Sequence, residues 1–174
     1  VMSDIKIEDN LLSLDVLNKI QQNMILNPRF PWYIGKILDD ENQLSCSSTY
    51  NYQFCHHFVG ELPDNPFSEK APTIELLYPI VEHMRVNAWK RIKGNLNPRT
   101  SSIIKHGFHI DYDNKHMKAS IFYLNTNDGY TEFEDGTKIE SIANRLVTFP
   151  ANLKHTGTTC TNIPFRVVIN FNYF

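Results

Sequence analysis

The sequence is short of glycine, cysteine, net charge and long apolar runs, and each shortage excludes a class of protein. Only seven glycines and nine prolines occur among 174 residues, which excludes a collagen-like or linker-rich chain. The formal charge is −2, so no overall field draws the chain toward nucleic acid or an anionic membrane. Cys46, Cys55 and Cys160 form an odd set without metal-type spacing, which fits free thiols in a reducing compartment. No apolar run approaches the ~20 residues of a membrane span. We therefore expect a cytoplasmic protein without a membrane segment.

The remaining composition is that of an ordinary folded domain. Hydrophobic residues make up 41% of the chain, and a chain of this length buries about 70% of its unfolded surface. We expect one domain, residues 1–174. The first 27 residues predict an entry strand and a helix, because apolar residues recur at helical spacing from Leu11 to Ile20, with Asp15 as a capping residue. A second helix is predicted over 72–86, and aromatic-rich runs at 31–38 and 50–60 are typical of strands.

From residue 87 the pattern changes to short strands separated by turn residues. Asp135-Gly136 lies between two of them and is typical of a hairpin. Seven strands at this spacing predict a jelly-roll core over about 87–174, with the two helices packed outside a mostly β domain. The predicted strands are 87–97, 103–110, 117–125, 130–134, 137–141, 144–149 and 164–174.

The chemically informative residues are two histidines and one aspartate. Residues two apart in a strand share a face, so His109 and Asp111 can direct an imidazole and a carboxylate at one point. His155 follows after the hairpin and another strand, which allows the chain to return to that point. Two histidines and a carboxylate are the ligand set of non-haem Fe(II) oxygenases, and this set leaves coordination positions open.

Arg166 lies inside the apolar, strongly β-forming run that ends the chain. A guanidinium there is costly to bury unless it is paired, and a carboxylate ligand would pair with it. The alternation of the strand places Arg166, Val168, Asn170 and Asn172 on one face, so the two asparagines are candidates for the same pocket. In the strand before His109, the parity set is Arg91, Lys93, Asn95 and Asn97.

The ordered set HGFHIDYD, KASIFYLN, TEFEDG, NRLVTFP, His155 and PFRVVINF resembles the Fe(II)- and 2-oxoglutarate-dependent dioxygenases. The resemblance is strongest to the prolyl 4-hydroxylase-like branch and its compact phage-encoded members, which would act in a host cytoplasm. It implies a double-stranded β-helix, cupin-like core, with iron held by His109, Asp111 and His155. It also implies that Arg166 and Tyr123 bind the C5 carboxylate of 2-oxoglutarate. Asn95 and Asn170 are further candidates for co-substrate binding. Asn97 stands where the prolyl hydroxylases commonly have tyrosine, which leaves open whether Lys93, Asn95 or Asn97 contacts the co-substrate.

The activity implied by the resemblance couples O2-dependent decarboxylation of 2-oxoglutarate, to succinate and CO2, with hydroxylation of a substrate. Ascorbate is an expected reductant. A peptidyl proline or a small molecule is the favoured substrate. A nucleobase demethylase and a non-catalytic jelly-roll binding module are the alternatives, and a nucleic-acid partner is disfavoured by the near-neutral charge.

The sequence says less about the residues and loops that flank the candidate metal ligands. The basic stretch from Arg85 to Lys105 contains no acid, and it is either a solvated face or a rim that attracts an acidic or phosphorylated substrate. His106 has the opposite parity to His109 and His116 follows a polar loop, so both are expected at the surface. Loops at 38–50, 61–71 and 113–118 are expected around the barrel mouth, where they would set specificity.

Overall fold

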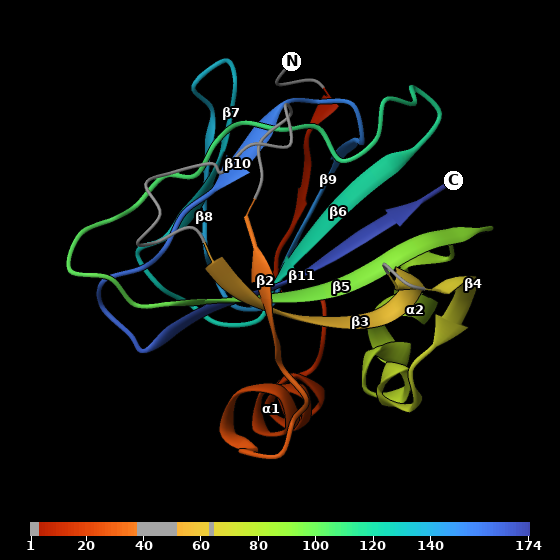
Figure 1. Cartoon of the computed structure of the whole chain (residues 1–174), viewed down its shortest axis with the longest axis horizontal. Coiled ribbons are helices and arrows are strands. Elements are labelled where there is room, and N and C mark those ends of the chain that lie inside the picture. The colour runs from red at the N-terminus through yellow and green to blue at the C-terminus, as the bar shows by residue number, and fades with distance from the viewer. Residues whose placement is uncertain (1–3, 38–51, 63–64) are drawn as a thin grey trace.

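Two antiparallel sheets form the jelly roll, and two helical segments cover one side of it (Figure 1). The computed structural model describes residues 4–37, 52–62 and 65–174. In this part of the chain the larger sheet has the order β1-β9-β6-β11-β5-β3-β2, and β4 pairs with β3. These strands are β1 (Lys6–Glu8), β2 (Tyr33–Lys36), β3 (Tyr52–Leu62), β4 (Asn65–Lys70), β5 (Trp89–Pro98), β6 (Lys118–Tyr123), β9 (Arg145–Pro150) and β11 (Phe165–Tyr173).

The smaller sheet closes the roll on the opposite side and has the order β10-β7-β8. Its strands are β7 (Tyr130–Phe133), β8 (Lys138–Glu140) and β10 (His155–Gly157). Asp135-Gly136 forms the predicted turn between β7 and β8, where Gly136 has a φ of 87° and the Asp135 carboxylate accepts a hydrogen bond from the Thr137 amide. The mostly β architecture predicted from the strand spacing is confirmed.

The two faces of the larger sheet pack into two different cores. Alternation along β6 places Phe122 against the helices, whereas Ile121 and Tyr123 face the interior of the roll. In β11, likewise, Val167, Ile169, Phe171 and Tyr173 contact the helix-side core. A strand that is buried on both faces needs apolar residues on both faces. Where polar residues occur on the inner face, side chains do not fill the interior of the roll and leave a cavity.

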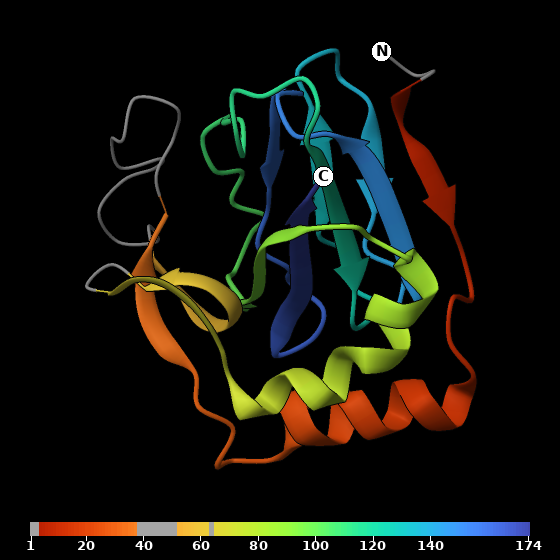
Figure 2. The same cartoon turned by 90° about the vertical axis from the view of Figure 1, so that its right-hand side faces the viewer.

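The helical segments lie next to one another beneath the larger sheet (Figure 2). The first is α1 (Leu14–Gln21), which continues as a π-helix, η2 (Gln22–Leu26). The second is a 3-10 segment, η3 (Pro72–Leu77), followed by α2 (Tyr78–Met84). Leu17, Ile20, Met24, Leu77 and Ile80 bury their side chains against the sheet. None of the helices in the described residues is long and apolar enough to cross a membrane.

The structure corrects four local predictions. Asp15 does not cap α1: the N-cap is Ser13, without a side-chain bond, and Asp15 lies in the first turn. The first half of the second helix is 3-10 rather than α-helix. Residues 61–71, predicted as a loop, contain β4, while the predicted loop 38–50 falls outside the described residues. Strands β1 to β4 also extend the larger sheet beyond the predicted core of 87–174.

A fifth correction concerns residues 103–110, which do not form a strand. Only two isolated bridges occur there, Lys105 to Thr158 and His109 to His155. Between these bridges this segment has one more residue than the chain opposite, so a regular ladder cannot form. The irregular segment crosses β10 and carries His109 and Asp111 over the mouth of the roll.

Candidate active site

His109, Asp111 and His155 converge at the open end of the roll. One atom capable of binding a metal from each of the three residues lies within 4.8 Å of the other two. The backbone sets this arrangement, because His109 and His155 exchange two N–H to carbonyl hydrogen bonds of 3.0 Å each. A further bond, from the Asp111 amide to the Ala151 carbonyl, fixes the chain just beyond His109. The structure therefore brings together the three predicted metal ligands.

Neighbouring polar groups orient these ligands. Nδ1 of His155 donates to the Leu153 carbonyl at 2.9 Å, which leaves Nε2 as the lone-pair nitrogen. The Asp111 carboxylate accepts a 2.8 Å bond from Asn172 Nδ2, and its other oxygen lies 3.3 Å from Arg91 Nη2. Arg91 Nε in turn donates to Asn172 Oδ1 at 3.0 Å. Asn172 and Arg91 thus hold the carboxylate from the side of the larger sheet.

The electrostatics favour an ionised Asp111. Burial raises the pKa of this carboxyl, but His155, Arg91 and His109 together with the Asn172 hydrogen bond outweigh burial and lower it. An ionised carboxylate beside two imidazoles is a donor set that suits a divalent transition metal such as Fe(II). The three residues present fit that group by their chemistry and by the spacing of their atoms.

Arg166 lies deeper in the roll, and its side chain is almost fully buried at 3% exposure. Its Nε donates to Ser141 Oγ at 2.9 Å, and its Nη2 donates to Thr131 Oγ1 at 3.3 Å. Among the described residues it forms no ion pair with an acid. Burial lowers the pKa of Arg166, because a guanidinium ion loses hydration there. A buried cation held only by two hydroxyls lacks the anion that would balance it.

Two glycines make room for the guanidinium. A Cβ at Gly129 would lie 2.6 Å from Arg166 Cδ and 2.6 Å from the Thr159 carbonyl oxygen, which no side chain tolerates. A Cβ at Gly157 would lie 3.5 Å from Arg166 Nη1. Glycine at position 129 is therefore required for the close approach of the arginine.

Tyr123 helps to hold Arg166 in place through Thr131. Its hydroxyl donates to Thr131 Oγ1 at 2.8 Å, and its ring lies 5.7 Å from the Arg166 guanidinium carbon. Burial raises the pKa of Tyr123, so the phenol is neutral. Thr131 lines the cavity, and with Ser141 it is an anchor residue that the sequence reasoning missed. The alternation of β7 could have indicated Thr131, which shares the inward face with Phe133.

A cavity of about 360 Å³ joins the three ligands to Arg166. The inner face of β5 forms one wall, where the whole predicted parity set faces the cavity: Arg91, Lys93, Asn95 and Asn97. Asn95 Oδ1 accepts the Cys55 thiol at 3.6 Å, and Asn97 is the register partner of Arg166. Asn170 also lines the cavity, and its Oδ1 is buried without a hydrogen-bond partner. The predicted asparagines therefore face the same pocket as Arg166.

His106 lies in this cavity as well, so its prediction as a surface residue is wrong. Its side chain is buried, and burial, together with Arg166 and His109, lowers its pKa to about 4. Residues 103–110 are not a strand, so the side chains of His106 and His109 do not alternate as in one. His116, by contrast, is exposed as predicted.

The sequence matches no protein-family model and no curated protein. Several solved structures share its fold. A prolyl hydroxylase from Trichoplax adhaerens, in complex with a hypoxia inducible factor oxygen degradation domain peptide fragment, has a TM-score of 0.64 at 16% identity over 98% of this chain and 83% of its own. An oxidoreductase of the 2OG-Fe(II) oxygenase family from Burkholderia pseudomallei has a TM-score of 0.66 at 11% identity, over 98% and 85%. A non-heme alpha ketoglutarate dependent epimerase from nogalamycin biosynthesis has a TM-score of 0.66 at 9% identity, over 98% and 78%. The chain has the prolyl-hydroxylase-like jelly-roll fold of these 2-oxoglutarate oxygenases.

Proposed function

We propose that this protein is an Fe(II)- and 2-oxoglutarate-dependent dioxygenase that hydroxylates its substrate. The observation that carries the proposal is Arg166, a buried guanidinium without an acidic partner among the described residues, at the end of a cavity that also holds a His-Asp-His cluster. A dicarboxylate that bridges a metal and an arginine would satisfy both ends of this cavity.

In the proposal His109, Asp111 and His155 hold the iron. Nε2 of His155 is available because its other nitrogen donates to a carbonyl. Asn172 and Arg91 keep the Asp111 carboxylate ionised and oriented. When bound, iron and 2-oxoglutarate supply the activation of O2 and the oxidation of a substrate C–H bond, and the co-substrate leaves as succinate and CO2.

Arg166 is proposed to bind the C5 carboxylate of 2-oxoglutarate. Ser141 and Thr131 fix the guanidinium, and the neutral Tyr123 hydroxyl fixes Thr131. Tyr123 thus acts on the anchor whether or not its hydroxyl also reaches the carboxylate. Asn95 and Asn170 are proposed to contact the chain of the co-substrate from the inner faces of β5 and β11.

The substrate is proposed to be a peptide or a small molecule. A peptide is supported by the fold of the Trichoplax adhaerens enzyme, which was solved with a peptide bound. The likeness to an epimerase supports the shared use of 2-oxoglutarate, while hydroxylation is the outcome that we propose for this chain. Buried free thiols at Cys55 and Cys160 support a reducing, cytoplasmic location.

Anaerobic titration with Fe(II) and 2-oxoglutarate tests the proposal. We expect a weak visible charge-transfer band in the wild-type protein and in His116→Ala, whose histidine is exposed and outside the cavity, but not in His155→Ala. Absence of the band from folded wild-type protein would refute the metal site.

Activity is then measured in air, with ascorbate to keep the iron reduced. Succinate formation and O2 uptake, with proline-containing peptides or small molecules as substrates, would distinguish the enzyme from a non-catalytic binding module. A module that binds iron and 2-oxoglutarate but yields no succinate with any of the candidates would contradict the proposed hydroxylase.

A further inference from the structure

The candidate active-site cavity has more positive charge than the proposed cofactors require. Among the residues that the structure describes, Lys36, Arg91, Lys93 and Arg166 line it, against one carboxylate, Asp111. Fe(II) and the 2-oxoglutarate dianion would cancel each other, so loading the site leaves the excess of cations unchanged. A partly desolvated cavity with an excess of positive charge attracts anions, because solvent screens the interaction between charges much less there than in bulk water.

Lys93 is the part of this excess that has no ionic partner within residues 4–37, 52–62 and 65–174. It lies in the middle of β5, faces the cavity and is half-buried. Its register partners are His57 on β3 and Asn170 on β11. Among the residues that the structure describes, it forms no ion pair and no side-chain hydrogen bond. An ammonium in this position loses hydration without gaining a counter-charge.

The two partners of Lys93 do not supply a counter-charge. Burial, followed by the charges of Lys93 and Arg91, lowers the pKa of His57 to about 4, so this imidazole is neutral near pH 7. Nδ1 of His57 and Oδ1 of Asn170 are both buried without hydrogen-bond partners. His57, Lys93 and Asn170 therefore present one ammonium group and two polar atoms without hydrogen-bond partners, and a polar ligand could bind all three.

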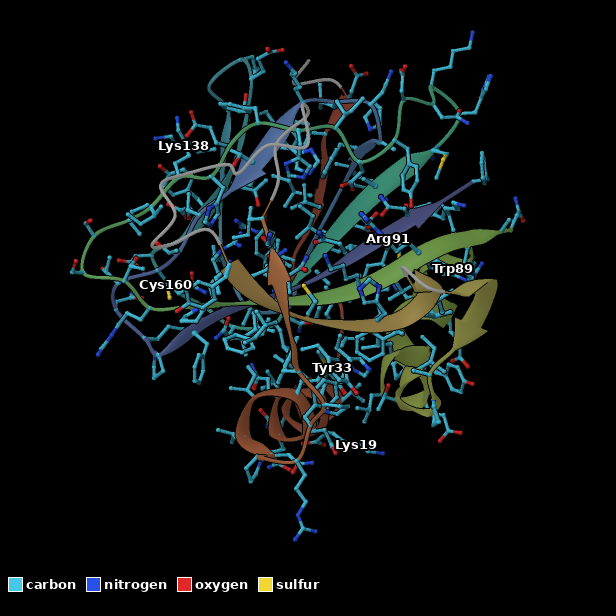
Figure 3. The ribbon with its side chains drawn as sticks, in the orientation of Figure 1. Lys19, Tyr33, Trp89, Arg91, Lys138 and Cys160 are labelled. Atoms are coloured by element: carbon cyan, nitrogen blue, oxygen red, sulfur yellow. The ribbon has the colours of Figure 1, made fainter. Side chains whose placement is uncertain are left out.

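Arg91 adds a second cation to the same wall. Its Nε and Nη2 are used by Asn172 and Asp111, while Nη1 has no hydrogen bond within the described part of the chain. Figure 3 labels this arginine beside β5 and β11. Lys93 and Arg91 are two residues apart on one strand face, about 7 Å between Cα atoms, so both side chains can reach a single anion.

We propose that the substrate carries an anionic group, a carboxylate or a phosphate monoester, that binds Lys93 Nζ and Arg91 Nη1 on the inner face of β5. This inference rests on the proposed function, because it assumes that Arg166 is occupied by the co-substrate. It narrows the substrate class from any peptide or small molecule to acidic ones. Lys36, exposed at the rim, would draw such a substrate toward the cavity.

The test uses the full chain, loaded anaerobically with Fe(II) and saturating 2-oxoglutarate, and blocked amino-acid amides as probes. Two matched pairs separate the sources of the anion: N-acetyl-phosphoserine amide against N-acetyl-serine amide, and N-acetyl-aspartate amide against N-acetyl-asparagine amide. Isothermal titration calorimetry should show binding of at least one anionic probe, at least about tenfold tighter than its neutral counterpart. Equal binding within both pairs, or no binding of either anion, would overturn the inference.

Variants then assign the binding to Lys93. In Lys93→Met the preferred anion should bind at least about tenfold more weakly, while Lys93→Arg should retain most of the affinity. Lys19→Met is the control, since Lys19 lies on α1, far from the cavity (Figure 3), and it should bind as the wild type does.

The charge-transfer band separates this inference from the proposed function. A wild-type protein without the band refutes the proposed function itself. A band that persists in Lys93→Met while the anion is lost supports the inference. If Lys93→Met instead loses 2-oxoglutarate binding, Lys93 contacts the co-substrate and the inference is wrong.

Discussion

Replacement of Arg166 by methionine should separate binding from stability. Methionine approximates the length of the arginine stem, fills the space beside Gly129 and removes the charge. Arg166 is 3% exposed, donates hydrogen bonds only to hydroxyl groups among the described residues, and has its pKa lowered by burial. The folded protein without ligand therefore carries a cation that is less stable there than in the unfolded chain. We expect Arg166→Met to be as stable as the wild type in the absence of 2-oxoglutarate, or more stable by about 1–4 kcal/mol.

Binding should change in the opposite direction. A guanidinium–carboxylate pair contributes two charge-assisted hydrogen bonds, each of about 1.5–3 kcal/mol. The loss of about 3 kcal/mol weakens 2-oxoglutarate binding by roughly 150-fold. At a concentration 100 times the wild-type Kd, the ligand stabilises the wild type by about 2.7 kcal/mol, and it would stabilise the variant by only about 0.3 kcal/mol.

Thermal unfolding with Mn(II), with and without 2-oxoglutarate, measures both effects. For a chain of this size, 2.7 kcal/mol corresponds to a rise in Tm of roughly 5–10 °C, against about 1 °C in the variant. Arg145→Met is the matched control: Arg145, whose side chain is 15% exposed, donates to both oxygens of the more exposed Asp9 at 2.6 and 3.0 Å, and its loss should cost about 1–2 kcal/mol with the ligand response intact. An Arg166→Met variant that keeps the ligand-induced rise, or that loses several kcal/mol without ligand, would refute the reasoning.

Three further predictions follow from contacts around the same cavity. Gly129→Ala places a Cβ 2.6 Å from Arg166 Cδ, so urea denaturation should show a loss of about 1–3 kcal/mol, with weaker 2-oxoglutarate binding; a variant as stable as the wild type would contradict the requirement for glycine. Asn172→Leu removes the 2.8 Å hydrogen bond to Asp111 and should weaken Mn(II) binding about 10- to 100-fold, whereas an unchanged titration would rule out this positioning role. Folding lowers the pKa of His57 from 6.5 to about 4, so between these pH values the imidazole is protonated in the unfolded chain and neutral in the folded one. The contribution of His57 to stability is complete above pH 6.5 and should fall by up to about 1 kcal/mol per pH unit on acidification. Urea denaturation at pH 7 and pH 5 should therefore show a smaller pH effect in His57→Asn, and an equal effect would contradict the assignment.

The regular strands were predictable because alternation is a strong constraint where both faces of a sheet are buried. In β6, for example, neighbouring Phe122 and Tyr123 lie in different cores, as the alternation of a strand requires. The same argument correctly placed Asn95 and Asn170 on the cavity side. The spacing between Asp111 and His155 only allowed the chain to return, and the family resemblance implied that His109 and His155 would converge.

The parts that were not predictable depend on tertiary contacts. Parity gave the wrong side for His106 because an extra residue between two bridges interrupts the alternation. Ser141 was missed because it lies just beyond the end of β8, where no alternation assigns its hydroxyl to a face, and the inward alternation of Thr131 in β7 does not by itself indicate an arginine partner. The 3-10 start of the second helical segment was also hidden, since the spacing of its apolar residues fits both kinds of helix.

The alternation in β11 has a consequence for how this protein can change over time. The odd-numbered positions from Val167 to Tyr173 contact the helix-side core, while even-numbered positions such as Arg166 and Asn170 face the cavity. A point substitution at a cavity-facing position such as Asn170 can thus alter ligand preference without disturbing the helix-side core. A single inserted or deleted residue would exchange the two sets, placing the guanidinium among aliphatic side chains and the phenylalanine in the cavity. The length of this strand must therefore be preserved for its cavity-facing and core-facing residues to keep their places.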